Sequence, residues 1–185
     1  VLSLIGIIYG AIVALVQPDL KKLVAYSSVS HMGFVTLGIF VFQEQGMQGA
    51  ILQMINHGLI TGALFLLVGV IYERAHHRDI DRFGGLAWAM PRYGVLGAFG
   101  IFASLGLPGL SGFIAEMMVF FGSFAGKLPH AQTYTVVATI GVVLGAAYIL
   151  VMIQKIFLGK PREKHEHPLH EPNGREWAML APLAV

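Results

Sequence analysis

Long apolar runs dominate this sequence and restrict the chain to folds that suit lipid. Hydrophobic residues make up 56% of the sequence and charged residues only 12%, whereas roughly a quarter of the residues in a soluble domain are charged. A helix needs about 20 apolar residues to cross a bilayer, and lipid admits only helices and closed barrels as spanning structures. We therefore expect an all-α, polytopic transmembrane helix bundle that forms a single membrane domain over residues 1–185. The expected spans are residues 1–16, 20–42, 47–72, 93–125 and 133–158, with a further span starting at residue 177.

The expected span over residues 93–125 is interrupted near its middle. Proline lacks a backbone N–H and clashes with the preceding turn, and glycine tolerates backbone conformations that other residues avoid. A broken helix is therefore predicted at Gly106, Pro108, Gly109 and Gly112. Glu116 follows the break with apolar neighbours on both sides. A discontinuous helix beside an intramembrane charge is typical of ion pathways in transporters; the alternative is a Pro-kinked span whose Glu pairs with a neighbouring helix.

Basic residues gather on one side of the expected spans. Cytoplasmic loops of membrane proteins carry an excess of Lys and Arg, so we expect the loops at residues 17–22, 73–92 and 159–176 to be cytoplasmic. This distribution accounts for the basic composition without a nucleic-acid-binding patch. Of the 12 Lys and Arg residues only Lys127 falls on the other side; the rest are Lys21, Lys22, Arg74, Arg78, Arg82, Arg92, Lys155, Lys160, Arg162, Lys164 and Arg175.

Three ionisable residues fall inside expected spans at similar depth. His31 lies near the middle of the second span, His57 lies near the middle of the third, and Glu116 follows the break in the fourth. Polar groups at this depth are costly and usually face the protein interior or water. Histidine titrates near neutral pH, so the set could pass protons in small energy steps. A histidine in a membrane helix can also be a hydrogen-bonded packing residue.

Other polar residues have two interpretations each. Tyr148 and Lys155 lie two turns apart on one face of the fifth expected span, and Lys155 is near enough to the interface to be either an anchor or a member of a pathway. Lys21 and Lys22 begin the second span, where they can extend to the interface. We expect no metal site, because His31, His57 and Glu116 lack ligand-motif spacing. The loop histidines His165, His167 and His170 fit a solvated charged loop.

Four stretches of the sequence, taken in order, carry a family resemblance. They are Pro18–Phe34, Gln53–Leu59, Tyr72–Arg74 and Leu105–Glu116. Together they resemble the antiporter-like membrane subunits of respiratory complex I, the proton-pumping NADH:quinone oxidoreductase. The resemblance covers nearly the whole chain and implies a fragment of a fourteen-helix subunit built from two inverted repeats, each with one broken helix. The chain starts inside an apolar run without Met, which also predicts a fragment.

The resemblance implies a proton relay along a chain of polar residues at the membrane midplane. His31 and His57 match two histidines of that chain in the family, and Glu116 matches the acid on the second broken helix, where the sister subunits carry Lys. Lys21 and Lys22 match a basic pair that begins a span. Further Glu and Lys positions of the family fall outside this chain.

The resemblance also implies cellular context and partners. We expect a multi-pass protein of the bacterial inner membrane that contacts neighbouring antiporter-like subunits, the lipid bilayer and protons. NADH, flavin, iron–sulfur clusters and quinone are expected in other subunits and no cofactor in this chain, which has no cysteine and no Rossmann glycine fingerprint. The chain would then belong to an enzyme only as a subunit of the oxidoreductase, a translocase.

Three alternatives stay open at this point. A subunit of a multisubunit cation/proton antiporter resembles the same fold, although Ser30–Phe34 and a Glu at position 116 argue against it. The matching chain of a photosynthetic NAD(P)H-like complex or of a membrane hydrogenase is the second alternative. The third is a membrane scaffold in which the polar residues only join helices.

Overall fold

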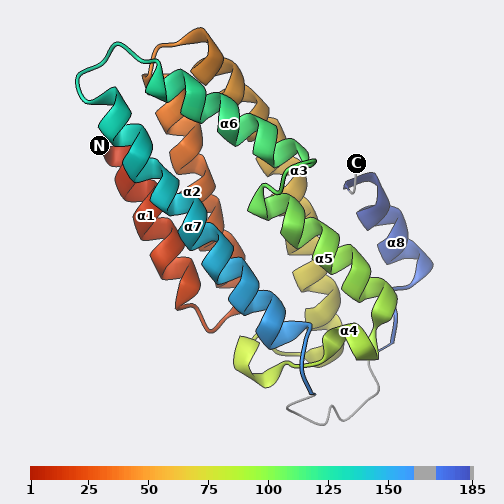
Figure 1. The fold of residues 1–185 in the computed structure, drawn as a ribbon. Coiled ribbons are helices and arrows are strands. Elements are labelled where there is room, and N and C mark those ends of the chain that lie inside the picture. Colours follow the sequence, from red (N-terminus) through yellow and green to blue (C-terminus); the bar gives the residue numbers. More distant parts are fainter. Residues whose placement is uncertain (161–169, 184–185) are drawn as a thin grey trace.

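The fold is a bundle of helices, as the computed structural model of residues 1–160 and 170–183 shows (Figure 1). The described residues contain no β-strand, and the predicted all-α bundle is confirmed. Arg162, Lys164, His165 and His167 lie outside the described residues. The helices are α1 (Leu2–Leu15), α2 (Leu20–Phe40), α3 (Glu44–Ala75), α4 (Leu86–Ala89), α5 (Pro91–Leu105), α6 (Ser111–Phe124), α7 (Ala131–Ile156) and α8 (Gly174–Leu180), with 3-10 turns at Ile80–Arg82 and Ala181–Leu183.

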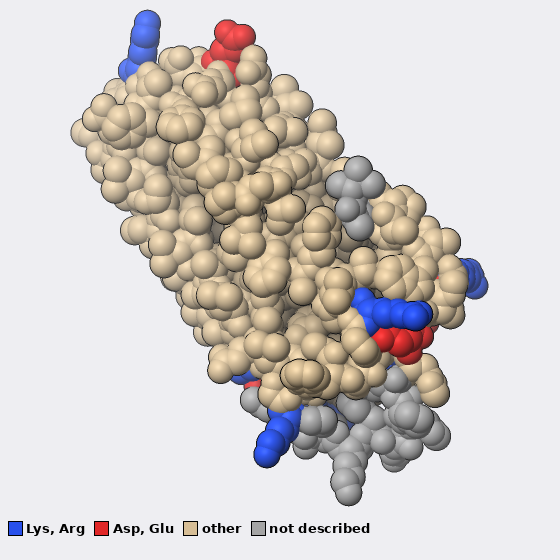
Figure 2. Space-filling model, turned by 45° about the vertical axis from the view of Figure 1, so that its right-hand side comes forward, with Lys and Arg blue, Asp and Glu red and all other residues tan. Residues whose placement is uncertain are grey.

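Three of the described helices are long and apolar enough to cross a membrane, namely α2, α3 and α7, while α1 and α6 are shorter apolar helices. On the face shown in Figure 2, charged side chains lie towards the two ends of the molecule and the broad surface between them is uncharged. An uncharged band between charged ends is what a bilayer requires of a protein that spans it.

The sequence at the helix ends explains where several helices begin. Asp19 caps α2, because its carboxylate accepts the backbone N–H groups of Lys21 (2.8 Å) and Lys22 (3.1 Å), which would otherwise be unpaired. Pro91 occupies the first position of α5, where its missing N–H costs nothing. Asn173 forms a capping box with Glu176 at the start of α8.

The predicted helix break is confirmed between α5 and α6. Gly106 ends α5 in the left-handed region (φ +69°), and Gly109 adopts φ +102° before α6 begins at Ser111. Glycine is favoured in that region because it has no Cβ, and Pro108 between them cannot donate a helical hydrogen bond. The two half-helices follow one another along the long axis of the bundle (Figure 1).

Two apolar clusters fill the interior. The larger cluster joins the first half of α2, the second half of α3, the start of α5 and the end of α7, and includes Leu67, Phe83 and Ile156. The smaller cluster joins α1, the second half of α2, α6 and α7, and includes Ile7 and Phe34. The polar residues in the middle of α2 and α3 therefore lie between two apolar regions.

The loops that carry most of the basic residues pack together at one end of the bundle. Leu20 N donates to Arg78 O (2.9 Å), and Gly85 N donates to Leu158 O (3.1 Å). Asp19 and Asp79 form an isolated β-bridge. The segments that follow α1, α3 and α7 are thus joined at one end of the bundle.

Glycine allows α3 and α6 to approach until their backbones are in contact. A Cβ on Gly122 would overlap the backbone nitrogen of Gly46 and lie 2.5 Å from its Cα, and a Cβ on Gly49 would lie 2.7 Å from Val119 N. Small residues at helix contacts are a principal means of packing membrane helices, since lipid supplies no hydrophobic drive between them.

We expect Gly122→Ala to destabilise the protein by about 1–3 kcal/mol, because the added methyl group has only backbone to displace. Gly58→Ala on α3 is the matched control, since no atom of residues 1–160 or 170–183 lies within 4 Å of its added Cβ. The measurement is thermal unfolding of the detergent-purified protein. Equal unfolding temperatures for the two variants would contradict the packing argument.

Candidate functional site

The structure brings His31, His57 and Glu116 together in the middle of the bundle. The carboxylate Oε1 of Glu116 on α6 lies 3.6 Å from Nδ1 of His31 on α2. The ring of His57 on α3 lies 5.7 Å from that of His31, centroid to centroid. Tyr148 on α7 places its hydroxyl 3.4 Å from Nε2 of His31. Four helices thus contribute one ionisable or hydroxyl side chain each to a single polar cluster.

His31 is the central member of this cluster because both of its ring nitrogens face a partner. A neutral imidazole has one N–H donor and one acceptor nitrogen, and an imidazolium has two donors. A proton taken up on one nitrogen of His31 can therefore leave from the other, between Tyr148 on one side and Glu116 on the other. His57 has a second contact, with the hydroxyl of Thr61 at 3.2 Å.

The cluster is largely closed to solvent but has room between its members. The side chains of His31 and Glu116 are 12% and 9% exposed. Two small cavities of about 10 Å³ adjoin the pair, one lined by Gln53 and His57 and the other by Tyr148. Each is close to the room that one water molecule needs. The buried atoms His31 Nδ1 and Gln53 Oε1 have no hydrogen-bond partner among the residues that the structure describes. The lining therefore suits water, which can bridge contacts longer than a direct hydrogen bond.

The helix break forms one wall of the site. A Cβ on Gly106 would lie 3.0 Å from Oε2 of Glu116, and one on Gly112 would lie 3.1 Å from Ala103 O. The absence of side chains at these two positions thus gives the carboxylate its place beside the end of α5 and lets α6 start against α5. The glycines predicted to break the helix also make room for the site.

The lysines with two interpretations lie outside this cluster. Lys155 Nζ pairs with Asp81 Oδ1 at 2.7 Å, and the two side chains are 39% and 58% exposed. This geometry favours the anchor over the pathway. Lys21 and Lys22 are exposed beside Asp19 at the start of α2.

The spacing of residues along a helix shows which side chains share a face, but it does not show which contacts they make with other helices. Gln53 belongs to the polar face of His57, and the structure adds that it lines the cavity next to His31 and Glu116. Ser27 and Ser28 share a face with His31, yet both hydroxyls donate to Val24 O of their own helix. Among the described residues no group of three or more His, Asp or Glu side chains is placed to hold a metal ion.

A bundle of apolar helices with a buried histidine–carboxylate cluster at a broken helix is an arrangement typical of membrane proteins that move ions. Residues 1–145 match the family described as "NADH:quinone oxidoreductase/Mrp antiporter, TM". The chain belongs to this family, and its predicted resemblance to the antiporter-like subunits is confirmed.

Individual relatives agree with the family match. The chain is 46% identical to the NADH-quinone oxidoreductase subunit M of Rhodobacter capsulatus over 186 residues, which covers 100% of this chain and 35% of the relative. It is 45% identical to the NADH-ubiquinone oxidoreductase chain 4 of Chondrus crispus, covering 100% of this chain and 37% of the relative. The structure of respiratory complex I from Thermus thermophilus with bound NADH contains a chain that superposes with a TM-score of 0.87 at 34% identity, covering 99% of this chain and 37% of that one. The chain thus spans little more than a third of the length of these relatives.

We predict that Gly106→Ala displaces the Glu116 carboxyl, whereas Gly109→Ala does not. Both glycines have positive φ and both substitutions strain the backbone. Only the Cβ at 106 meets Glu116, since no atom of the described part of the chain lies within 4 Å of the Cβ at 109. A lipophilic carbodiimide, which adds to protonated carboxyls in apolar surroundings, reports the change by mass spectrometry of the peptide that contains Glu116. Contacting residues couple by about 0.5–3 kcal/mol, so the labelling rate should change by about twofold or more in Gly106→Ala alone. The same rate in both variants would refute a specific contact.

Proposed function

We propose that this chain is part of the subunit called M in bacteria and chain 4 in mitochondria, a proton-translocating membrane subunit of NADH:quinone oxidoreductase. The observation that carries the proposal is the contact series Tyr148–His31–Glu116, with His57 beside it, at a helix break. The names of the relatives from Rhodobacter capsulatus and Chondrus crispus support the choice of subunit.

Proton transfer in this site runs through His31. A proton that reaches His31 or His57 from the cytoplasmic side is shared between the two neighbouring rings through water. His31 passes the proton from Nδ1 to the Glu116 carboxylate when these two atoms, 3.6 Å apart in the structure, come within hydrogen-bond distance. The protonated carboxyl then discharges to the far side when a neighbouring charge changes.

The relay needs an external source of energy. Moving one charge against a membrane potential costs about 2.3 kcal/mol per 100 mV. Quinone reduction elsewhere in the complex supplies this energy by changing the charges and hydration along the membrane arm. NADH, flavin, iron–sulfur clusters and quinone are held by other subunits in this proposal, and this chain carries no redox centre of its own.

The loops at residues 17–22, 73–92 and 159–176 are proposed to face the cytoplasm of a bacterial cell, across its inner membrane. The contacts that join the described parts of these loops at one end of the bundle support a common side. The positive-inside rule assigns that side. The lateral partners in this proposal are the neighbouring antiporter-like subunits of the complex.

A cation/proton antiporter subunit is the second candidate, because the family description includes Mrp antiporters. The two candidates differ in what drives ion movement. Ion transport that depends on sodium and proceeds without quinone chemistry would favour the antiporter. Ion transport that needs neither sodium nor quinone chemistry would favour a related complex such as a membrane hydrogenase.

We expect Glu116→Gln to abolish coupled proton pumping in the assembled complex. Gln keeps the size and hydrogen bonding of the side chain but cannot take up and release a proton. The proton-to-electron ratio of the reconstituted complex is the measurement, and Glu44→Gln is the matched control, because Glu44 is an exposed carboxylate at the start of α3. Wild-type pumping in assembled Glu116→Gln would make Glu116 a structural acid, as a scaffold predicts.

Lys155→Gln is expected to leave the proton-to-electron ratio at its wild-type value. The ion pair with Asp81 is partly exposed, and such pairs contribute about 0–1 kcal/mol to stability, so assembly should be nearly unchanged. His31→Gln, measured in parallel, should lower the ratio because it removes the central proton carrier. A loss of pumping in Lys155→Gln would show that Lys155 is a member of the proton pathway and not only an anchor.

A further inference from the structure

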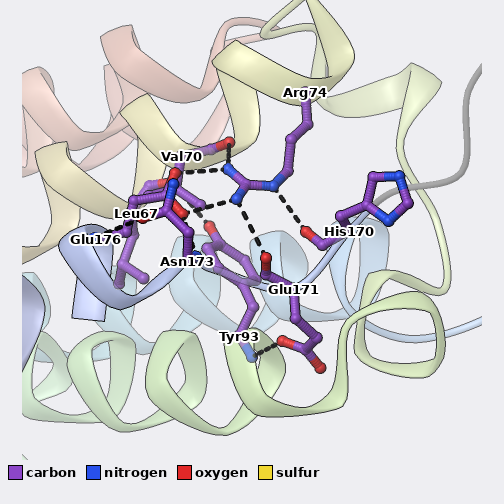
Figure 3. Close-up of polar contacts among 8 residues, drawn as sticks. All are labelled: Leu67, Val70, Arg74, Tyr93, His170, Glu171, Asn173 and Glu176. Carbon is purple, nitrogen blue, oxygen red and sulfur yellow. Dashed lines mark hydrogen bonds and ion pairs between the residues drawn. The ribbon is translucent and has the colours of Figure 1, made fainter.

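The segment of residues 170–176 is fastened to the end of α3 by Arg74, and Figure 3 shows this arrangement. The guanidinium makes two parallel hydrogen bonds to the Glu176 carboxylate, at 2.8 and 2.7 Å. It also donates to the backbone oxygens of Val70 (2.9 Å), His170 (2.7 Å) and Glu171 (3.3 Å). All five N–H donors of the arginine are therefore used, and the bidentate geometry makes the contact to Glu176 a strong one.

The same segment is fastened to the start of α5 by Glu171. Its carboxylate accepts the backbone N–H groups of Arg92 (2.9 Å) and Tyr93 (3.2 Å). Figure 3 shows the contact with Tyr93. These N–H groups belong to the first turn of α5, where a helix has unpaired donors and a partial positive charge. Tyr93 in turn donates its buried hydroxyl to Leu67 O of α3 (2.9 Å). We call the set Arg74, Glu171 and Glu176 the α3–α5 clasp.

The clasp is a long way from the polar cluster, but a rigid element connects the two. From Tyr93 to Gly106, α5 rises about 20 Å at 1.5 Å per residue. Unlike a full span, α5 has only one end near the membrane surface, because its other end is the break at Gly106 beside Glu116. The position of Gly106 along the axis of α5 is therefore fixed by the packing of α5 and by the contacts that hold the first turn of α5.

We infer that Arg74, Glu171 and Glu176 are positioning residues, which hold α5 so that Gly106 meets the Glu116 carboxyl. That the position of Gly106 affects proton transfer rests on the proposed function. That the three residues hold α5 in place is argued from their contacts alone.

The chemistry of the clasp suits a permanent fastening at neutral pH. The hydrogen bonds from Arg74 hold the pKa of the Glu176 carboxyl below its usual value. A carboxyl with a lowered pKa in the folded state contributes stability above its unfolded pKa and loses that contribution as the pH falls through the folded value. The Arg74–Glu176 pair thus stays charged at neutral pH.

The test compares variants of the clasp in the complete, assembled complex. Glu171→Ala removes the acceptor at the start of α5, Glu171→Gln keeps one acceptor without the charge, and Arg74→Lys keeps the charge without the bidentate geometry. Arg175→Gln on α8 is the control, because Arg175 is exposed and its substitution removes a basic charge from the same segment. The first readout is carbodiimide labelling of Glu116 as a function of pH, and the second is the proton-to-electron ratio.

We expect Glu171→Ala to change the labelling rate of Glu116 by about two- to thirtyfold, since residues of a coupled network contribute about 0.5–2 kcal/mol. Glu171→Gln should be intermediate, and Arg175→Gln should match the wild type. Wild-type labelling in assembled Glu171→Ala and Arg74→Lys would overturn the inference. If Arg74→Lys fails to assemble, the two Glu171 variants decide. Altered labelling of Glu116 in the clasp variants, together with wild-type pumping in Glu116→Gln, would support the positioning role of the clasp and contradict the proposed relay.

Discussion

The helix break beside Glu116 is the feature on which the rest of the structure depends. An unbroken helix would present only side chains at this depth, because its backbone groups pair internally. The left-handed turn at Gly106 ends α5 in the middle of the bundle. A Cβ at this residue would lie only 3.0 Å from Oε2 of Glu116, so the glycine makes room for the carboxylate. The break thus opens space in the bundle interior for an acid that lipid would not accommodate.

The two apolar clusters give this site its character. They lie on either side of it along the bundle, so the polar side chains share a region of low dielectric in which an unpaired polar group is costly. Yet the contacts of His31, at 3.4 and 3.6 Å, are longer than typical hydrogen bonds. A shift of a few tenths of an ångström would close or open them, and a site with contacts near this limit can alternate between paired and separated states.

The sequence allowed more of the site to be predicted than of its supports. Gly and Pro residues indicated the break, and the cost of burying charge pointed to His31, His57 and Glu116, since these signals are local. The clasp could not be predicted, because Arg74 and Glu176 are about a hundred positions apart and only the tertiary fold brings them together. The capping box of Asn173 and Glu176 accounts for the start of α8 but does not point to Arg74. Lys155 stayed ambiguous for the same reason, as its partner Asp81 lies on another segment.

Helix spacing connects the packing to the chemistry. Gly33 on α2 lies against Ile7 of α1, and Gly49 on α3 lies against α6, so that larger residues at either position would push the helices apart. Because lipid provides no hydrophobic force between helices, such close contacts and a few polar pairs hold the bundle together. The same spacing determines whether His31 reaches Glu116. Scaffold and relay therefore require the same geometry, and they differ in one property only, which is whether the side chains at the centre exchange protons.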